Sequence, residues 1–157
     1  MTKIHLTLTV NGESREVLVD PRRTLLDTLR NHLDLHGVHR GCDTGNCGAC
    51  TVILNDKPVT ACMVLAADCE GAEVLTIEGV AHDGGLHPVQ RALVETGGIQ
   101  CGYCTPGMVM SAVALLNENA HPTTDEVRLG LAGNLCRCTG YKKIVEAVLS
   151  ANTGGAE

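Results

Sequence analysis

The stretch GCDTGNCGAC, residues 41–50, places three cysteines and three glycines within ten positions. Cys42, Cys47 and Cys50 have the spacing C-x4-C-x2-C, and Cys62 follows twelve residues after the last of them. Thiols gathered in this way on a glycine-rich backbone are typical of a loop that wraps a metal centre. The stretch therefore predicts a metal-binding loop with four sulfur ligands.

The spacing also indicates which metal centre this loop holds. C-x4-C-x2-C with a remote fourth cysteine is the plant-type ferredoxin pattern for a [2Fe–2S] cluster. Gly41, Gly45 and Gly48 allow unusual backbone angles, so that peptide N–H groups can point at the sulfurs of an anionic cluster. Arg40 is expected to add positive charge nearby. The alternative is a four-cysteine zinc site, but zinc ribbons usually carry two C-x2-C pairs, so the spacing favours iron and sulfide.

A second group of cysteines follows, with Cys101 and Cys104 as a C-x2-C pair and Cys136 and Cys138 as a C-x-C pair. Both pairs precede expected helices, and a helix N-terminus presents free N–H groups that suit an anionic ligand. From spacing alone this group is compatible with zinc, a redox-active dithiol or a second cluster. No βαβ pattern surrounds the C-x2-C pair, which disfavours a thioredoxin-like dithiol and leaves zinc and a cluster equally open.

Composition and charge exclude several classes of protein. The chain of 157 residues has a net charge of −6, whereas nucleic-acid-binding domains usually carry a basic stripe. No apolar run reaches the ~18 residues of a membrane span, and the N-terminus lacks the apolar core of a signal peptide. We therefore expect a cytoplasmic protein without direct membrane insertion. Nine cysteines in such a chain favour metal ligation over disulfides.

The first half of the chain has the pattern of a mixed α+β domain that ends near Gly79. Apolar and polar residues alternate at its start, and Asn11-Gly12 is a strong hairpin signal. Thr24, followed three residues later by an acidic residue, resembles the capping box of a helix whose apolar face extends to Leu33. The strands are expected at residues 4–10, 15–19, 51–54 and 74–77.

After about residue 80 the apolar period becomes helical, which predicts a small helical bundle. Pro88 and Pro106 suit first helical positions, because the missing N–H of proline would be unpaired there in any case. Thr123 and Glu126 form a capping-box pattern. The four helices are expected at residues 88–95, from 106 onward, from 123 to about 131, and at 141–149.

Three motifs taken together, GCDTGNCGACTV, QCGYCTPGM and GNLCRCTGY, resemble the iron–sulfur subunit of the molybdenum hydroxylases. That family includes xanthine dehydrogenases, aldehyde oxidases, bacterial carbon monoxide dehydrogenases and 4-hydroxybenzoyl-CoA reductases. The resemblance runs from about residue 4 to residue 151 and includes all eight expected cysteines. It implies an α+β chain, with a β-grasp, plant-type ferredoxin-like domain over residues 1–79 and an all-α four-helix [2Fe–2S]-binding domain over residues 80–157.

The resemblance also implies a place in an electron-transfer chain. In this family a large subunit carries a molybdenum–pterin cofactor, a medium subunit carries FAD, and two [2Fe–2S] clusters relay electrons between them. Gln100 and Cys138 are the positions that would approach the pterin. This chain lacks the sequence for either partner site, so we expect a heterotrimer that doubles into a dimer of heterotrimers. The cluster nearer molybdenum would be held by Cys101, Cys104, Cys136 and Cys138, and the cluster nearer FAD by Cys42, Cys47, Cys50 and Cys62.

Two other functions are compatible with the cysteines alone. One is a free-standing two-cluster ferredoxin, and the other is a zinc-stapled interaction protein with no redox role. The ninth cysteine, Cys69, falls outside both sets and is expected to be a small, partly buried apolar residue, with a reactive thiol as the alternative. Tyr103 and Tyr141 flank candidate ligands, and we expect them to pack, with shielding of a cluster from water as the alternative.

Overall fold

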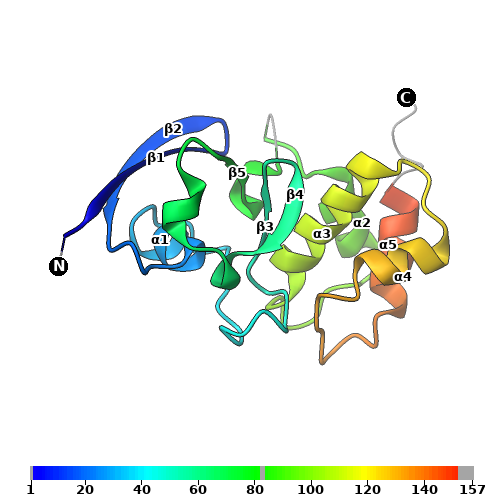
Figure 1. Ribbon diagram of the computed structural model, residues 1–157. Helices are drawn as coiled ribbons and strands as arrows, with labels where there is room; N and C mark the ends of the chain where they lie inside the picture. The colour runs from blue at the N-terminus through cyan, green and yellow to red at the C-terminus, as the bar shows by residue number, and fades with distance from the viewer. Residues whose placement is uncertain (1, 82–83, 152–157) are drawn as a thin grey trace.

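The computed structural model describes residues 2–81 and 84–151, which form a mixed sheet followed by a group of helices (Figure 1). The sheet has the strand order β2-β1-β5-β3-β4, and α1 (Leu25–Asn31) packs against it. The arrangement confirms the predicted ferredoxin-like fold of the first half. The strands are β1 (Ile4–Val10), β2 (Glu13–Val19), β3 (Thr51–Leu54), β4 (Lys57–Thr60) and β5 (Glu73–Leu75).

The hairpin and the last strand establish the sheet. β1 and β2 pair antiparallel across Asn11 and Gly12, whose φ angles of 52° and 81° are both positive, as a tight hairpin turn requires. β1 pairs in parallel with β5, and β5 pairs antiparallel with β3. The strand that is last in sequence is therefore the central strand of the sheet.

β2 begins at Glu13, two residues earlier than predicted, and three further details of the first half differ from the sequence-based expectation. β5 ends at Leu75 because Thr76 leaves the ladder, where its N–H donates to Oδ1 of Asn11 at 2.9 Å. α1 ends at Asn31, so Leu33 lies beyond the helix and packs at the edge of the core. β4 was not predicted, because it contains Pro58; it is an edge strand, where a missing N–H is tolerated.

The described part of the second half contains the four predicted helices, which are α2 (Pro88–Glu95), α3 (Thr105–Glu118), α4 (Thr124–Gly130) and α5 (Lys142–Ala151). The predicted capping box before α4 is formed, because Thr123 Oγ1 accepts from Glu126 N–H while the Glu126 carboxylate accepts from Thr123 N–H. Thr24 likewise caps α1 through the N–H of Asp27. None of the helices in the described part of the chain is long and apolar enough to span a membrane.

Two clusters of buried aliphatic side chains share the strand β3. Val52 belongs to the cluster under the sheet and α1, whereas Ile53 belongs to the cluster among the helices. Successive side chains of a strand point to opposite faces, so β3 is buried on both sides. Figure 1 shows α3 beside β3, and this packing is one of the contacts that join the two halves. The loop before β3 is therefore anchored at the junction of the two cores.

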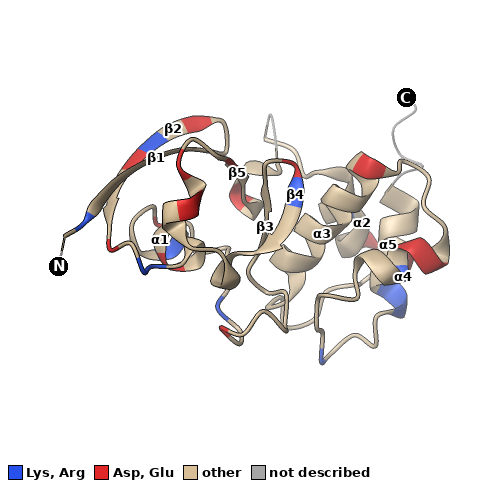
Figure 2. Cartoon of the chain, in the orientation of Figure 1, with Lys and Arg blue, Asp and Glu red and all other residues tan. Residues whose placement is uncertain are grey.

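Charged side chains are scattered over both halves rather than segregated into positive and negative patches. Figure 2 shows Lys and Arg interspersed with Asp and Glu along the strands, the helices and the loops. Within residues 2–81 and 84–151 the figure shows no continuous basic stripe of the kind that binds nucleic acid.

Candidate metal centres

The first four candidate ligands meet at the open end of the β3–β4 hairpin. Cys42, Cys47 and Cys50 lie on the loop that leads into β3, and Cys62 lies in the short 3-10 helix η1 (Ala61–Met63) after β4. The antiparallel hairpin returns the chain to its start, where Ala61 N–H donates to the Cys50 carbonyl oxygen at 3.2 Å. Side-chain contacts then join Cys42 to Cys47 and Cys50 to Cys62. The hairpin thus brings the remote cysteine beside the loop.

The exposed and buried ends of this first thiol set differ in their electrostatics. Hydrogen bonds from the side chain and the backbone of Thr44 lower the pKa of the Cys42 thiol to about 6, and Thr44 N–H donates to the Cys42 sulfur at 3.4 Å. Burial raises the pKa of Cys47, and it raises the pKa of Cys50 to about 12. Metals bind the thiolate form, and the charge of a bound metal centre is what can keep such a buried thiol ionised.

At each of the three loop glycines a different neighbour leaves no room for a Cβ. A Cβ at Gly41 would lie 2.7 Å from the sulfur of Cys47. At Gly45, where φ is +77°, a Cβ would lie 2.9 Å from Cγ of Met63. Gly48 has φ of +68°, and a Cβ there would clash with a backbone carbonyl oxygen of the loop between α4 and α5. Gly41 therefore makes room for a candidate ligand, whereas Gly48 permits close contact between the two halves.

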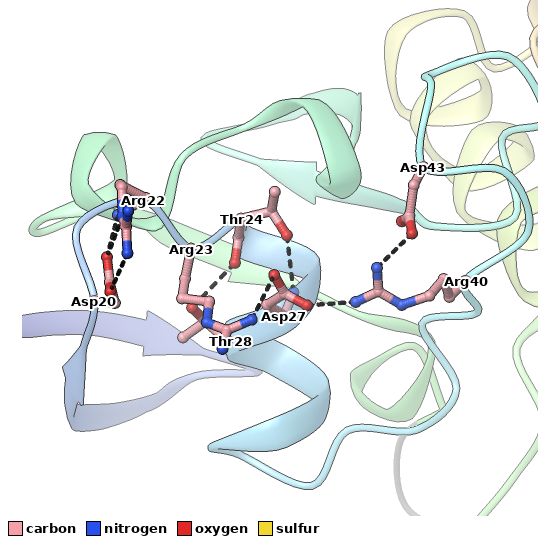
Figure 3. Close-up of polar contacts among 8 residues, drawn as sticks. All are labelled: Asp20, Arg22, Arg23, Thr24, Asp27, Thr28, Arg40 and Asp43. Carbon is pink, nitrogen blue, oxygen red and sulfur yellow. Dashed lines mark hydrogen bonds and ion pairs between the residues drawn. The ribbon is translucent and has the colours of Figure 1, made fainter.

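Arg40 does not direct free positive charge at the thiols, which corrects the expectation from the sequence. Its guanidinium forms ion pairs with Asp27 on α1 and with Asp43, the latter at 2.6 Å, and Arg23 approaches Asp27 at 3.7 Å (Figure 3). Burial alone would raise the pKa of Asp27, but the hydrogen bond and charge of Arg40 hold that pKa below its usual value. Arg40 therefore fastens the start of the cysteine loop to α1.

The second four candidate ligands lie between the start of α3 and the loop before α5. Cys104 is the N-cap residue of α3, and it contacts Cys136. The sulfurs of Cys101 and Cys138 are 3.6 Å apart. Tyr141, at a φ of +66°, accepts a hydrogen bond on its hydroxyl oxygen from the N–H of Cys136 at 2.7 Å. Tyr141 thus shapes the C-x-C loop, a role beyond the packing that the sequence indicated.

The second thiol set also has a more buried and a more exposed pair, since Cys104 and Cys136 are half-buried whereas Cys101 and Cys138 are exposed. Burial raises the pKa of Cys104 to about 12. Burial would likewise raise the pKa of Cys136, but hydrogen bonds from the side chain and the backbone of Thr139 lower it, and Thr139 Oγ1 lies 3.1 Å from the Cys136 sulfur. At the exposed end, contact with Cys101 raises the pKa of Cys138. Each set therefore contains one thiol whose ionised form is stabilised by a threonine.

Direct contacts between the two loops join the two sets. The N–H of Leu135, the residue before the C-x-C pair, donates to the carbonyl oxygen of Cys47 at 2.9 Å. Asn134 is only 3% exposed, and its Nδ2 donates to the carbonyl oxygen of Gly48 at 3.0 Å. Its Oδ1 accepts from Ser111 Oγ at 2.7 Å. No local pattern in the sequence indicates this junction, because its partners are far apart along the chain.

Comparison with known proteins identifies the family. Residues 8–77 match the model of a 2Fe-2S iron-sulfur cluster binding domain, and residues 76–149 match that of a [2Fe-2S] binding domain. The chain is 49% identical over 148 residues to the nicotinate dehydrogenase small FeS subunit of Eubacterium barkeri, covering 94% of each. This chain belongs to the iron–sulfur subunits of the molybdenum hydroxylases.

Two solved structures show the same fold in different chain contexts. A chain of quinoline 2-oxidoreductase from Pseudomonas putida 86 matches with a TM-score of 0.94 and 37% identity, covering 98% of this chain and 96% of that one. The aldehyde oxidoreductase of Desulfovibrio desulfuricans ATCC 27774 matches with a TM-score of 0.92 and 47% identity, covering 98% of this chain but 17% of that one. The iron–sulfur subunit thus corresponds to a nearly complete chain in one relative and to a small part of a longer chain in the other.

The donor sets of the iron–sulfur subunit fit two binuclear clusters. All nine cysteines are free thiols; eight lie in the two sets, and Cys69 lies apart from them, more deeply buried than the partly buried position expected from the sequence. Within each set the thiols contact in two pairs, and weaker charge interactions connect the pairs. Two pairs suit a centre with two irons, each of which takes two cysteines. Over residues 2–81 and 84–151, no group of three or more His, Cys, Asp or Glu side chains is placed to hold a single metal ion.

The outer edge of the second set lies on an open surface of the iron–sulfur subunit. Gln100, Cys101 and Cys138 are exposed. Beside them an apolar groove of ≈ 310 Å³ runs between α2 and α3. Two of its lining residues, Leu86 and Val94, are 51% and 60% exposed, although they are large aliphatic side chains. Contiguous exposed apolar surface of this kind is typical of a face that another protein covers.

Proposed function

We propose that this iron–sulfur subunit transfers electrons within a multi-subunit molybdenum hydroxylase, between the molybdenum–pterin centre and FAD on partner subunits. A [2Fe–2S] cluster, when bound, takes up and releases one electron at a time. The observation that carries the proposal is the presence of two four-thiol sets in one chain, joined by direct contacts between their loops. A free-standing ferredoxin is the less supported alternative, because the relative from Eubacterium barkeri is named as a small subunit.

The ligand assignment is part of this proposal. One cluster would be held within residues 1–79 and the other within residues 80–157, which we propose as the two domains. Thr44 and Thr139 hydrogen-bond to the sulfurs of Cys42 and Cys136 and stabilise their thiolate forms. Cys50 and Cys62 are buried, and Cys104 and Cys136 are half-buried, which limits the access of water to one side of each set. The ligands would be Cys42, Cys47, Cys50 and Cys62 in the first set and Cys101, Cys104, Cys136 and Cys138 in the second.

The surfaces support an orientation between two larger partners. The exposed edge at Gln100 and Cys138, with the apolar groove beside it, would face the molybdenum-binding subunit. The first thiol set would then lie toward the FAD-binding subunit. We propose a heterotrimer that doubles into a dimer of heterotrimers, which the native mass of the purified complex tests. We also propose a cytoplasmic location, because ligand thiols must stay reduced until they bind iron; cell fractionation tests it.

Iron and sulfide analysis tests the presence of two clusters. The purified subunit should contain about four irons and as many sulfides per chain, as two [2Fe–2S] clusters require. Cys47→Ser should lower the iron content to about half, with one of two reduced EPR signals lost. Cys69→Ala is the matched control, because Cys69 is a buried cysteine outside both sets, and it should keep all the iron. Zinc in place of iron would refute the redox function.

A pair of variants in the assembled complex tests the order of the two sets. When substrate is added to Cys47→Ser, the EPR signal of the second set should still appear, while the flavin stays oxidised. When substrate is added to Cys104→Ser, the signal of the first set should not appear. The opposite pattern would mean that the first set lies nearer molybdenum, and it would overturn the proposed order without affecting the presence of two clusters.

A further inference from the structure

Tyr103 forms a contact between the two cysteine loops that neither motif suggests. It lies between Cys101 and Cys104, yet its hydroxyl donates to the carbonyl oxygen of Arg40 at 2.7 Å. The side chain of His39 forms a second hydrogen bond in the opposite direction along the chain, with Nδ1 at 2.8 Å from the carbonyl oxygen of Tyr103. The two rings also stack, with centroids 4.7 Å apart and an interplanar angle of 22°. We name His39 and Tyr103, with these three contacts, the clasp.

The clasp attaches to a segment that is itself firmly held. The carbonyl oxygen of Arg40 is bound by Tyr103, while its guanidinium is bound by Asp27 of α1 and by Asp43 (Figure 3). The residues that lead into Cys42 are therefore fixed from two directions, by the helical half and by α1. Because the start of the first loop cannot shift independently of α1, it provides a stable reference point for the second loop.

The clasp is the second of two attachments between the loops. The first is formed by the contacts of Leu135 with Cys47 and of Asn134 with Gly48, which involve the C-x-C side of the second set. That attachment leaves the C-x2-C side without a hydrogen bond to the first loop. Two loops attached on one side can still move relative to each other on the other side, whereas a second attachment there restricts that motion. The clasp supplies this second attachment at Tyr103.

We propose that Tyr103 and His39 are positioning residues that set the separation and orientation of the two thiol sets. The proposal rests on the proposed function, since it assumes that each set holds a cluster, and it goes further by assigning the geometry between them to two residues outside the ligand sets. The clasp itself exchanges no electron or proton and forms no covalent bond. Its contact at His39 needs an Nδ1–H, which both the Nδ1 tautomer and the imidazolium provide.

Three variants separate the parts of the clasp in the intact complex. Tyr103→Phe removes the hydroxyl bond to Arg40 and keeps the stacked ring. His39→Phe removes the bond to the Tyr103 carbonyl oxygen and also keeps a stacked ring. Tyr103→Ala removes the ring and its hydroxyl together. His32→Ala is the matched control, because His32 is an exposed histidine just upstream of the same segment.

The readout is the magnetic interaction between the two reduced clusters, measured from their EPR signals at low temperature. This interaction depends on the separation and the orientation of the clusters, whereas the g values of each signal report its own ligands. Tyr103→Ala should weaken the interaction and broaden its distribution while both sets of g values stay unchanged. The two phenylalanine variants should give smaller changes in the same direction, and His32→Ala should match the wild type.

Hydrogen exchange in the same complexes provides the second measurement. Loss of one clasp hydrogen bond should raise the exchange rate of the segment 101–105 by roughly twofold to tenfold, the factor that one hydrogen bond supplies. An unchanged magnetic interaction and unchanged exchange in Tyr103→Ala would overturn the proposal. If the Tyr103→Ala complex does not assemble, an unchanged magnetic interaction and unchanged exchange in both phenylalanine variants overturn the proposal. Absence of two EPR signals in the wild type would instead refute the proposed function.

Discussion

The buried side chain of Asn134 gives the sharpest test of how the two halves are joined. It is 3% exposed and lies between the two cysteine loops. Its Oδ1 accepts from Ser111 Oγ at 2.7 Å, and its Nδ2 donates to the Gly48 carbonyl oxygen at 3.0 Å and to Thr51 Oγ1 at 3.4 Å. Substitution by alanine removes all three contacts and leaves a small cavity where the carboxamide was.

The magnitude follows from these contacts. The two shorter bonds are worth about 1 kcal/mol each, whereas the 3.4 Å contact is too long to add much. The carbonyl oxygen of Gly48 keeps its hydrogen bonds from the N–H and the hydroxyl of Thr51, which limits the loss there. The cavity adds about 1 kcal/mol. Asn134→Ala should therefore lower the free energy of unfolding by about 3 kcal/mol, which corresponds to a fall in Tm of roughly 6–12 °C for a chain of this size.

The assay is thermal unfolding of the cluster-loaded subunit, followed by far-UV circular dichroism. Asn117→Ala is the control, because Asn117 is an exposed residue of the same helix α3 as Ser111, and it should change the stability by no more than ~0.5 kcal/mol. Ser111→Ala should cost about 1 kcal/mol. The double variant should lose less than the sum of the single losses, because both substitutions remove the same bond. A Tm for Asn134→Ala within roughly 2 °C of the wild type would refute the proposed hydrogen-bonded junction.

Two further predictions concern the same region. Gly107→Ala should destabilise the subunit by about 1–3 kcal/mol in urea unfolding, because a Cβ there would clash with a backbone oxygen of the first loop; Gly133→Ala, where a Cβ meets nothing within 4 Å, is the control, and equal losses would contradict the steric reason. Arg40→Gln should lower the free energy of unfolding by about 1 kcal/mol near pH 7, a modest amount because Arg40 is partly exposed and solvent weakens its ion pairs. Because Arg40 lowers the pKa of Asp27 below 3.8, the contribution of this pair is complete above that pH and is lost as the pH falls through the lower folded-state pKa. The Tm difference between wild type and Arg40→Gln should therefore stay constant from neutral pH to about 5 and shrink below 3.8, and a difference that grows in acid would contradict the assigned ion pair.

Local signals explain why most elements of the fold could be predicted from the sequence. The hairpin at Asn11-Gly12 and the capping box at Thr123 each depend on residues within four positions of one another, and both are formed. β4 was missed because Pro58 and its polar neighbours lack a strand pattern; pairing with β3 overrides this. The end of β5 was also missed, because it depends on the side chain of Asn11, which is distant in sequence.

The grouping of the cysteines could be predicted from the sequence for a similar reason, whereas the side-chain contacts around them could not. Ligand spacing is a local property, so the motifs alone group the eight thiols that the structure brings together. The direction of the Arg40 side chain is not local, because it depends on Asp27, which the fold of α1 presents to it. The clasp between His39 and Tyr103 joins residues 64 positions apart, and no pattern in either motif indicates it.

The first cysteine loop carries two structural requirements in one short stretch. Its thiols form one metal-binding set, and Gly48 within it approaches the second half so closely that neither Gly48 nor Gly107 has room for a Cβ. A contact between backbones leaves no side chain that could adjust to a shift, so the relative position of the halves is strictly defined at this point. Cys47 is adjacent to Gly48, and its carbonyl oxygen accepts a hydrogen bond from Leu135. The position of the first thiol set relative to the second half is therefore defined by the same contact. Gly48, which the cysteine motif assigns to the metal site, is therefore explained by the contact that joins the two sets.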